Sequence, residues 1–273
     1  MIDISTIDYS ELDRPEVLGY LFYPRPESGH PDSVKGIENL QIPVGGSHVL
    51  GAAIHMAAKS DPTILFFHGN GEIVRDYDDI GMMYSRLNIN FMPVDYRGYG
   101  RSTGTPTVTN MMRDCHEIFD FTITLLKTGG CSGPLIVMGR SLGSASAVEL
   151  ASHYPEDIDG LIVESGFSSM AGLYERLGIH ASIPANKRKG LSNTDKISVF
   201  TKPTLIIHAE FDHIIPFSAG RNLYNAAGAS DKTLLKIPGA NHNDLFFRGR
   251  EAYLNAIVRL IDKTKAAVSS RNL

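Results

Sequence analysis

The chain alternates short apolar runs with amphipathic segments through most of its length. Between the runs, apolar residues recur at helical spacing, which predicts helices near Val74–Leu87, Val108–Leu126, Leu142–His153, Ser218–Ala227 and Leu245–Lys263. Continuous apolar strands separated by helices are typical of a mostly parallel sheet that is covered on both faces. The runs that we interpret as these strands are Thr63–Phe67, Asn90–Val94, Leu135–Met138, Gly160–Val163, Thr204–Ile207 and Thr233–Ile237.

Two segments before this alternation follow a different pattern. In Ile37–Val44 and Val49–Ala57, polar and apolar residues partly alternate on either side of Val44-Gly45-Gly46-Ser47. This pattern predicts an antiparallel pair of strands at a sheet edge, with one face in water. Together with the six apolar runs, it predicts an α/β fold with an eight-stranded, mostly parallel sheet.

Two stretches stand outside the alternation. Residues 1–35 are acidic and rich in proline, with an apolar patch at Val17–Tyr23, and we expect an arm that packs on the domain. Residues 165–200 form an insert, in which the basic cluster Lys187-Arg188-Lys189 is either a solvated loop or a contact for an anionic substrate. A chain of 273 residues fits a single domain over 1–273.

Composition narrows the class of protein. The chain is 42% hydrophobic and 21% charged, and its formal net charge of −4 argues against a nucleic-acid partner. The two cysteines, Cys115 and Cys131, match no metal-binding or redox spacing. The first residues lack the features of a signal peptide, and no apolar run is long enough to span a membrane, so we expect a cytoplasmic protein.

One motif carries the strongest chemical signal. Gly139-Arg140-Ser141-Leu142-Gly143 lies between an apolar run and a small-residue helical segment. This order predicts a strand, a tight turn and a helix, with Ser141 at the apex of the turn. Amide hydrogens at a helix N-terminus favour negative charge, as a nucleophile that forms an oxyanion requires. The alternative is an ordinary surface turn, because G-x-S-x-G also arises by chance.

From this motif onward the chain resembles the α/β-hydrolase superfamily. The resemblance implies the α/β-hydrolase fold, with residues 165–200 as a short cap over the site. Most of the segments that carry it follow a predicted strand, where sites form in parallel sheets. Beside the serine motif they are His68-Gly69-Asn70-Gly71, Asp95-Tyr96-Arg97-Gly98-Tyr99-Gly100-Arg101-Ser102, His208-Ala209-Glu210-Phe211-Asp212-His213-Ile214-Ile215-Pro216 and Gly239-Ala240-Asn241-His242-Asn243-Asp244.

The resemblance implies a role for each segment. Ser141 would be the nucleophile, Asp212 the acid and His242 the base, in the chain order Ser–Asp–His of this superfamily. The backbone amides of Leu142 and Asn70 would form the oxyanion hole, although the amide of Gly71 is an alternative to that of Asn70. His68 would brace its loop, and the Asp95–Ser102 loop would be structural. Glu210 and Asp244 are the rivals of Asp212.

The expected function is that of a serine hydrolase that cleaves a carboxylic ester or thioester. The motifs are most similar to single-domain esterase and depalmitoylase-like members, which need no cofactor or metal. The substrate would be a small-molecule ester or thioester, acylated ones included. Two alternatives stay open: a peptidase or amidase of the same fold, and a non-enzymatic ligand-binding protein. The glycine pairs do not continue as G-x-G-x-x-G, which disfavours dinucleotide binding. The oligomeric state stays open.

The insert could contribute to substrate choice. Met170, Leu173 and Leu177 fall at helical spacing, so one helix face could line the site as an apolar wall for an acyl chain. The alternative is that this face only packs on the domain. Ile179 and Ile183 continue the apolar pattern of the insert.

Overall fold

The computed structural model of the protein describes residues 2–28, 36–176 and 192–271. The chain divides into two compact units, Met1–Gly133 and Pro134–Leu273. Their strands form an eight-stranded, mostly parallel sheet with helices, which confirms the predicted α/β class. The single domain over 1–273 stays a prediction.

The first unit holds four strands in the order β1-β2-β4-β3. β1 and β2 pair antiparallel around the Gly45-Gly46 turn, as their alternation predicted. β3 and β4 are parallel and buried along their whole length, which agrees with their continuous apolar sequences. The bounds are β1 (Ile37–Val44), β2 (His48–His55), β3 (Thr63–Phe67) and β4 (Asn90–Val94).

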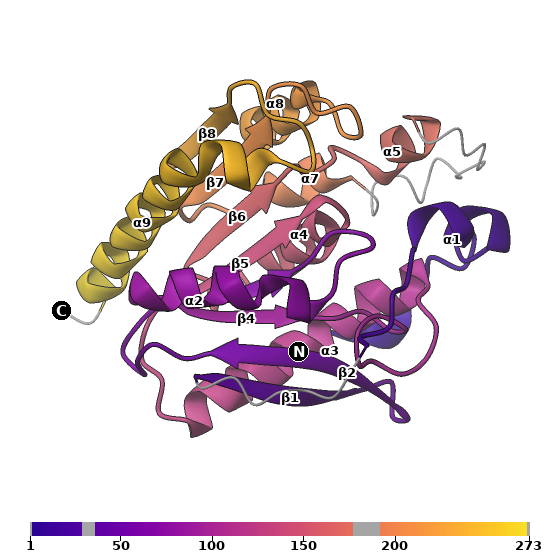
Figure 1. The fold of residues 1–273 in the computed structure, drawn as a ribbon, viewed down its shortest axis with the longest axis horizontal. Helices are drawn as coiled ribbons and strands as arrows, with labels where there is room; N and C mark the ends of the chain where they lie inside the picture. Colours follow the sequence, from indigo (N-terminus) through magenta and orange to yellow (C-terminus); the bar gives the residue numbers. More distant parts are fainter. Residues whose placement is uncertain (1, 29–35, 177–191, 272–273) are drawn as a thin grey trace. The chain divides into compact units, whose positions relative to one another are not determined.

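Helices cover both faces of this four-stranded part. α2 (Asp78–Arg86) packs on β4 and α3 (Val108–Thr128) packs on β1, on opposite sides of the strands (Figure 1). A 3₁₀ turn, η2 (Val74–Tyr77), precedes α2, so the helix predicted near Val74–Leu87 is present with a tighter first turn. α3 begins after Thr107, whose hydroxyl caps the Asn110 amide.

The described residues of the N-terminal arm pack on their own unit. A 3₁₀ turn, η1 (Ile4–Thr6), precedes α1 (Pro15–Leu21), in which Val17 and Leu21 are buried. Asp13 accepts a hydrogen bond from the amide of Val108 at the start of α3. The helix α1 was missed from the sequence, although a proline at its first position and apolar residues four apart are helix signals.

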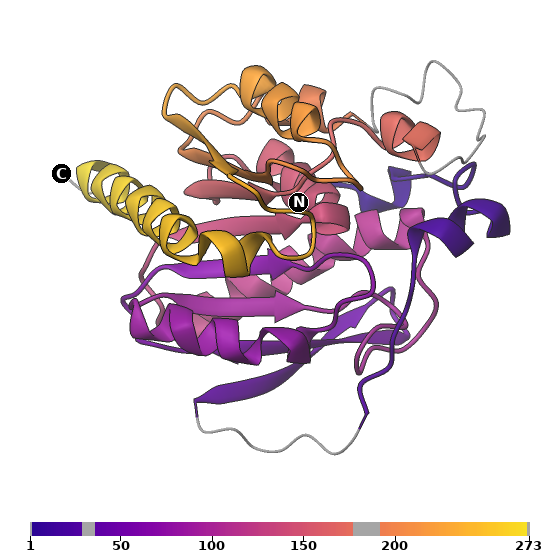
Figure 2. The same ribbon diagram turned by 45° about the horizontal axis from the view of Figure 1, so that its top comes forward.

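The second unit holds β5 (Leu135–Arg140), β6 (Gly160–Glu164), β7 (Thr204–Ala209) and β8 (Lys232–Ile237), all parallel and in chain order. β5, β6 and β7 run further than predicted, because their ladders continue into polar residues such as the pair Arg140 and Glu164. Figures 1 and 2 show α9 on one face of these strands and α4 and α8 on the other. Their bounds are α4 (Ser144–His153), α8 (Phe217–Ala226) and α9 (Leu245–Arg271).

The insert contains two short helices, α5 (Met170–Arg176) and α7 (Asn193–Ile197). α5 confirms the helical spacing predicted from Met170 onward, and both Met170 and Leu173 are buried. A β-bridge between Ser169 and Ser192 joins the two ends of the intervening segment. Leu177, Ile179, Ile183 and Lys187-Arg188-Lys189 lie outside the described residues.

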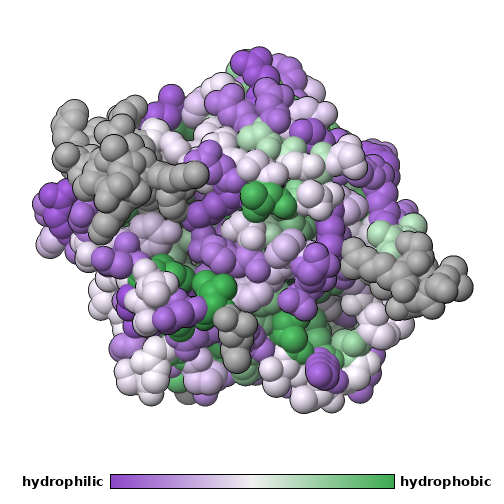
Figure 3. Space-filling model, turned by 180° about the vertical axis from the view of Figure 1, so that it is seen from behind, coloured by the Kyte–Doolittle hydropathy of each residue, from purple (hydrophilic) through white to green (hydrophobic). Residues whose placement is uncertain are grey.

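Large apolar side chains are exposed at scattered positions. The face drawn in Figure 3 shows small apolar patches separated by polar residues, as is common on protein surfaces. Among the described residues, no helix combines the length and the apolar character that a membrane crossing needs. The most exposed apolar residues are Tyr20, Tyr23, Val199, Phe211 and Phe247.

His55 makes the stability of the first unit sensitive to acid. Its side chain is almost fully buried at the end of β2, and neither ring nitrogen has a hydrogen-bond partner among the described residues. Burial lowers the pKa of His55 from 6.5 to about 4. The unfolded chain therefore binds this proton at a higher pH than the folded one, so this histidine costs stability as the pH falls from about 6.5 to about 4.

We predict that His55→Leu removes this part of the acid sensitivity. The free energy of unfolding of the wild type should fall by about 1 to 3 kcal/mol more than that of the variant between pH 6.5 and pH 4. Urea unfolding at four pH values across this window measures the difference. Parallel curves for the two proteins would contradict the assignment, even if the variant were less stable at every pH.

Candidate active site

The Ser141 turn is strained, and a close backbone approach holds it. Ser141 follows the last residue of β5 and has a φ of +50°, in the left-handed region that few non-glycine residues adopt. A Cβ on Gly139 would lie 2.2 Å from the carbonyl oxygen of Gly143, so only glycine fits there. The predicted order of strand, tight turn and helix is confirmed.

The residues after Ser141 begin a helical segment. The 3₁₀ turn η3 (Ser141–Gly143) leads directly into α4, and the Ser144 hydroxyl donates to the carbonyl of Ser141 at 2.6 Å. The first amides of a helical segment have no acceptor within it, and they can bind an anion. The amide of Leu142 belongs to this turn, and its role as an oxyanion donor stays a prediction.

Three predicted site residues lie in contact within the second unit. The Oγ of Ser141 is 3.1 Å from Nε2 of His242, and Nδ1 of His242 is 2.7 Å from Oδ2 of Asp212. All three side chains are more than nine-tenths buried. They follow β5, β7 and β8, so the carboxyl ends of three parallel strands place them together.

Asp212 is held as a carboxylate. Burial alone would raise the pKa of Asp212, but hydrogen bonds from His242 and the amide of Ile215 hold it below its usual value. Its Oδ1 accepts from the amides of Ile214 and Ile215 at 3.0 and 2.8 Å. A carboxylate at Nδ1 favours the imidazole tautomer that carries its proton there, which leaves the Nε2 lone pair facing Ser141.

The rival acids bind elsewhere. Oε1 of Glu210 is 2.7 Å from Nζ of Lys236, and its Oε2 accepts from the amide of Gly239 at 3.0 Å. The hydrogen bond from Lys236 lowers the pKa of Glu210. Asp244 accepts from the amide of Asn241 and pairs with Arg248. Asp212 is therefore the carboxylate that the structure brings to His242.

A second histidine lies beside Asp212 and was not found from the sequence. Nε2 of His208, on β7, donates to the carbonyl of Ile215 at 2.8 Å and is 3.6 Å from Oδ2 of Asp212. Burial lowers the pKa of His208, although the hydrogen bond to Ile215 and the charge of Asp212 oppose this shift. A neutral His208 leaves the Asp212 carboxylate paired with His242. The sequence places His208 four residues before Asp212, but it does not show that the side chain of His208 is buried there.

A buried ion pair also contacts the histidine loop. Nη1 of Arg140 is 2.7 Å from Oε1 of Glu164, and Nη2 of Arg140 donates to the carbonyl of His242 at 3.0 Å. The hydroxyl of Tyr253, on α9, donates to Oε2 of Glu164 at 2.6 Å. None of the three was predicted to contribute to the site.

The His68–Gly71 loop lies in the first unit, where polar contacts fix it. The side-chain oxygen of Asn70 accepts from the hydroxyl of Tyr99 at 2.6 Å and from the amide of Tyr23 at 2.7 Å. Nε2 of His68 is 3.2 Å from Oδ1 of Asp95, so His68 braces its loop as expected. The oxyanion role of the Asn70 amide stays a prediction.

The Asp95–Ser102 loop is held by its charged residues, which agrees with the structural role expected of it. Asp95 accepts from the amide of Val74 at 2.9 Å. Arg97 makes two hydrogen bonds of 2.7 Å to the carboxylate of Asp114 on α3. A Cβ on Gly100 would lie 2.0 Å from the Asp95 carboxylate, so this turn requires glycine.

A pocket of about 150 Å³ lies beside the insert in the second unit. Leu173 of α5 lines it, and so does Ile215, whose amide binds Asp212 in the acid loop. The other lining residues combine apolar and polar side chains, among them Phe167, Ser168, Ser169, Arg176 and Pro216. An apolar wall next to the Asp212 loop is consistent with the acyl-wall hypothesis, which stays a proposal.

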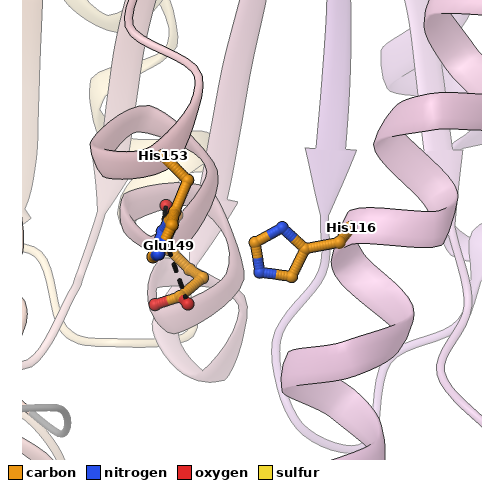
Figure 4. A group of neighbouring side chains, drawn as sticks. All are labelled: His116, Glu149 and His153. Carbon is orange, nitrogen blue, oxygen red and sulfur yellow. Dashed lines mark hydrogen bonds and ion pairs between the residues drawn. The ribbon is translucent and has the colours of Figure 1, made fainter. Parts of the chain in front are cut away.

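Glu149 and His153 form a second polar group of the same unit. They lie one turn apart on α4, with Nδ1 of His153 3.5 Å from Oε1 of Glu149 (Figure 4). Nζ of Lys196 is 2.6 Å from the other carboxylate oxygen of Glu149. Glu149 is thus a buried glutamate with a cationic partner, as Glu164 is.

Comparisons with known proteins identify the family of the chain. The family model described as "Serine aminopeptidase, S33" matches residues 58–181. The human α/β-hydrolase domain-containing protein 17B is 30% identical over 228 residues, which cover 80% of this chain and 72% of that protein. The chain belongs to the α/β-hydrolase family. The Caenorhabditis elegans α/β-hydrolase domain-containing protein aho-3 is 32% identical over 76% of this chain, but the match spans only 59% of that relative.

Solved structures of low sequence identity share the fold of this α/β-hydrolase. The ferulic acid complex of Est1E from Butyrivibrio proteoclasticus has a TM-score of 0.68 at 18% identity and covers 82% of this chain and 100% of its own. A soluble variant of the Saccharomyces cerevisiae monoglyceride lipase has a TM-score of 0.67 at 16% identity, over 85% and 96% of the two chains. The predicted α/β-hydrolase fold is confirmed.

We predict that Asp212→Asn and Glu210→Gln have very different effects on turnover. Asp212→Asn should lower kcat by about 10⁴-fold, because the amide no longer selects the productive tautomer of His242. Glu210→Gln removes a charge from the same loop without touching His242, so kcat should change by less than about threefold. Steady-state kinetics on any ester that the wild type hydrolyses checks both. The reverse ranking would transfer the role of the acid to Glu210.

Proposed function

We propose that this α/β-hydrolase cleaves a carboxylic ester or thioester through an acyl-enzyme on Ser141. The observation that supports this most directly is the unbroken contact from Ser141 Oγ through His242 to Asp212. The serine lies at a strained turn at the start of a helical segment. These are the features that a serine nucleophile needs: a base in reach, an orienting acid and nearby amide donors.

The reaction would run in two halves. His242 Nε2 takes the hydroxyl proton as Ser141 Oγ bonds to the substrate carbonyl carbon, and the carbonyl oxygen becomes an oxyanion. The amides of Leu142 and Asn70 are the proposed donors to it. The tetrahedral species collapses, and His242 gives the proton to the departing alcohol or thiol. Water then attacks the acyl-serine in the same way, and the acid leaves while Ser141 regains its proton.

An amide substrate is the second candidate, because the matching family model carries the description of a serine aminopeptidase. The same acyl-enzyme would form, and only the leaving group would differ. An amine must be protonated before it departs, whereas a thiolate or a phenolate leaves readily, so activated esters alone do not separate the two functions. The intact three-residue contact supports an enzyme over a binding protein. The cytoplasmic location and the lack of a cofactor or metal remain predictions.

We predict that a fluorophosphonate probe labels the protein at Ser141. The probe phosphonylates a serine that is activated by a base, so peptide mapping should find the adduct on this residue. Labelling should be lost in Ser141→Ala and strongly slowed in His242→Ala. The matched control is Ser144→Ala, at the first residue of α4, which should still be labelled.

A substrate panel completes this test. Alkyl esters, acyl thioesters and aminoacyl anilides of the same acyl group should be compared by kcat/KM. Esters and thioesters should exceed the anilides by orders of magnitude, whereas the opposite order would favour the amidase. An adduct on another serine would reject Ser141 as the nucleophile.

We predict that Leu173→Ala changes the preference for acyl length. If the pocket beside the insert takes the acyl chain, kcat/KM of the wild type should rise over the first few carbons and then level off, because each buried methylene adds at most about 0.8 kcal/mol. The shorter side chain should move the levelling point to longer chains. A p-nitrophenyl ester series measures both profiles. An unchanged profile would reject the acyl wall and leave Ser141 in place.

A further inference from the structure

The residue before the proposed nucleophile is a buried arginine that reaches the loop of the proposed base. Arg140 ends β5, and its side chain is about nine-tenths buried. One guanidinium nitrogen donates to the main-chain carbonyl of His242 at 3.0 Å. The backbone of Arg140 therefore leads into Ser141, while its side chain holds the main chain of His242. A single residue links the two partners of the proton transfer.

Glu164 fixes the direction of this guanidinium. Arg140 and Glu164 are register partners in the parallel ladder of β5 and β6, and Nη1 of Arg140 lies 2.7 Å from Oε1 of Glu164. Tyr253 donates to the other carboxylate oxygen at 2.6 Å, so both oxygens of Glu164 are engaged. The planar fork of an arginine, held in this way, can present its second nitrogen in one direction only.

Both partners of the ion pair directly precede a strained serine. Ser141 follows Arg140 with a φ of +50°, and Ser165 follows Glu164 with a φ of +46°. Left-handed conformations cost free energy in residues other than glycine, and they persist where the surroundings fix them. The ion pair joins the ends of β5 and β6 at the points where these turns begin. It therefore helps to hold both serines in their left-handed conformations.

We propose that Arg140 is a positioning residue of the Ser141–His242 pair, with Glu164 as the charge that balances it. Arg140 holds the main chain of His242 where Nε2 meets Ser141 Oγ. Glu164 cancels the cationic charge close to the imidazole, so the protonated base of the reaction is not disfavoured. This inference rests on the proposed function of Ser141.

The charges around His242 give the proposal a signature that a merely structural role lacks. Among the described residues of the second unit, two charged groups contact His242: Asp212 binds its ring, with His208 beside that carboxylate, and Arg140 binds its main chain, with Glu164 as its ion-pair partner. Asp244, two residues after His242, pairs with Arg248. Removing Glu164 takes a negative charge away from the surroundings of His242, which disfavours the imidazolium. Removing Arg140 takes a positive charge away, which favours the imidazolium. The two substitutions therefore act in opposite directions.

The pH profile of kcat/KM tests this directly. The acidic limb of the profile, where the base loses its proton, should move to lower pH in Glu164→Gln and to higher pH in Arg140→Gln, each by about half to one pH unit. In Arg140→Gln, kcat should also fall by about 10- to 100-fold with KM little changed, because a displaced base affects the reaction and not substrate binding. Arg140→Lys keeps the charge but not the fork, so its limb should stay near that of the wild type while kcat falls.

Glu149→Gln is the matched control. It also converts a buried glutamate with a cationic partner to an amide in the same unit, and the contacts of Glu149 described above are to His153 and Lys196. It should lower the melting temperature as Glu164→Gln does, and it should leave the pH limb in place. Tyr253→Phe removes one hydrogen bond to Glu164 and no charge, so it should lower kcat a few-fold without moving the limb.

The outcomes separate the two proposals. If Glu164→Gln and Arg140→Gln move the limb in the same direction, or not at all, the positioning role is wrong, whatever their stability. If Arg140→Gln does not fold, the pH of the acidic limb in Glu164→Gln, compared with that in Glu149→Gln, still tests the positioning role. If Ser141→Ala keeps its activity and its fluorophosphonate labelling, the proposed function has failed, and that result is independent of the limb.

Discussion

The close passage of the chain at Gly139 is the constraint on which the proposed site depends. The carbonyl of Gly143 approaches to a distance that a Cβ could not accept, so the strand can turn at once into the helical segment. Ser141 takes up the resulting strain in its left-handed conformation. Its side chain consequently leaves the strand end towards His242, and its neighbour Leu142 lies in the 3₁₀ turn that leads into α4. A side chain at position 139 would widen this turn and move Ser141 away from His242 and from the start of the helical segment.

The other two members of the contact lie on loops, which by themselves position side chains poorly. Here the loops are joined to each other. The amide of Phe211 donates to the carbonyl of Ala240, and that of Glu210 to the carbonyl of Ile237. The Glu210 side chain adds a contact to the amide of Gly239, so the rival of Asp212 ties the acid loop to the histidine loop. The two carboxylates of the acid loop thus have different tasks: Glu210 joins the loops, and Asp212 contacts the imidazole.

The sequence predicted the strands and the strand-end residues well, because continuous apolar runs define buried parallel strands and their ends converge on one edge. It also ranked Asp212 above Glu210, which the geometry supports. The Arg140–Glu164–Tyr253 group could not be found in this way. It depends on the register of β5 against β6 and on where α9 passes, and Tyr253 lies 89 residues from Glu164 in the chain. Helix α1 was missed because its two buried residues were interpreted as part of an irregular arm.

The buried charges of the second unit follow one rule that a pattern of residue types does not reveal. Burying a carboxylate away from water costs free energy unless hydrogen bonds replace its hydration. Asp212 receives two amides and an imidazole, and Glu164 receives a guanidinium and a phenol. His208 lies next to Asp212, yet burial keeps it neutral, so it adds no competing cation. As a result, His242 has one anionic partner, Asp212, because the positive charge of Arg140 is balanced by the negative charge of Glu164. In the proposed reaction, the proton that His242 would exchange responds mainly to the charge of Asp212, so that a single imidazole could act first as base and then as acid.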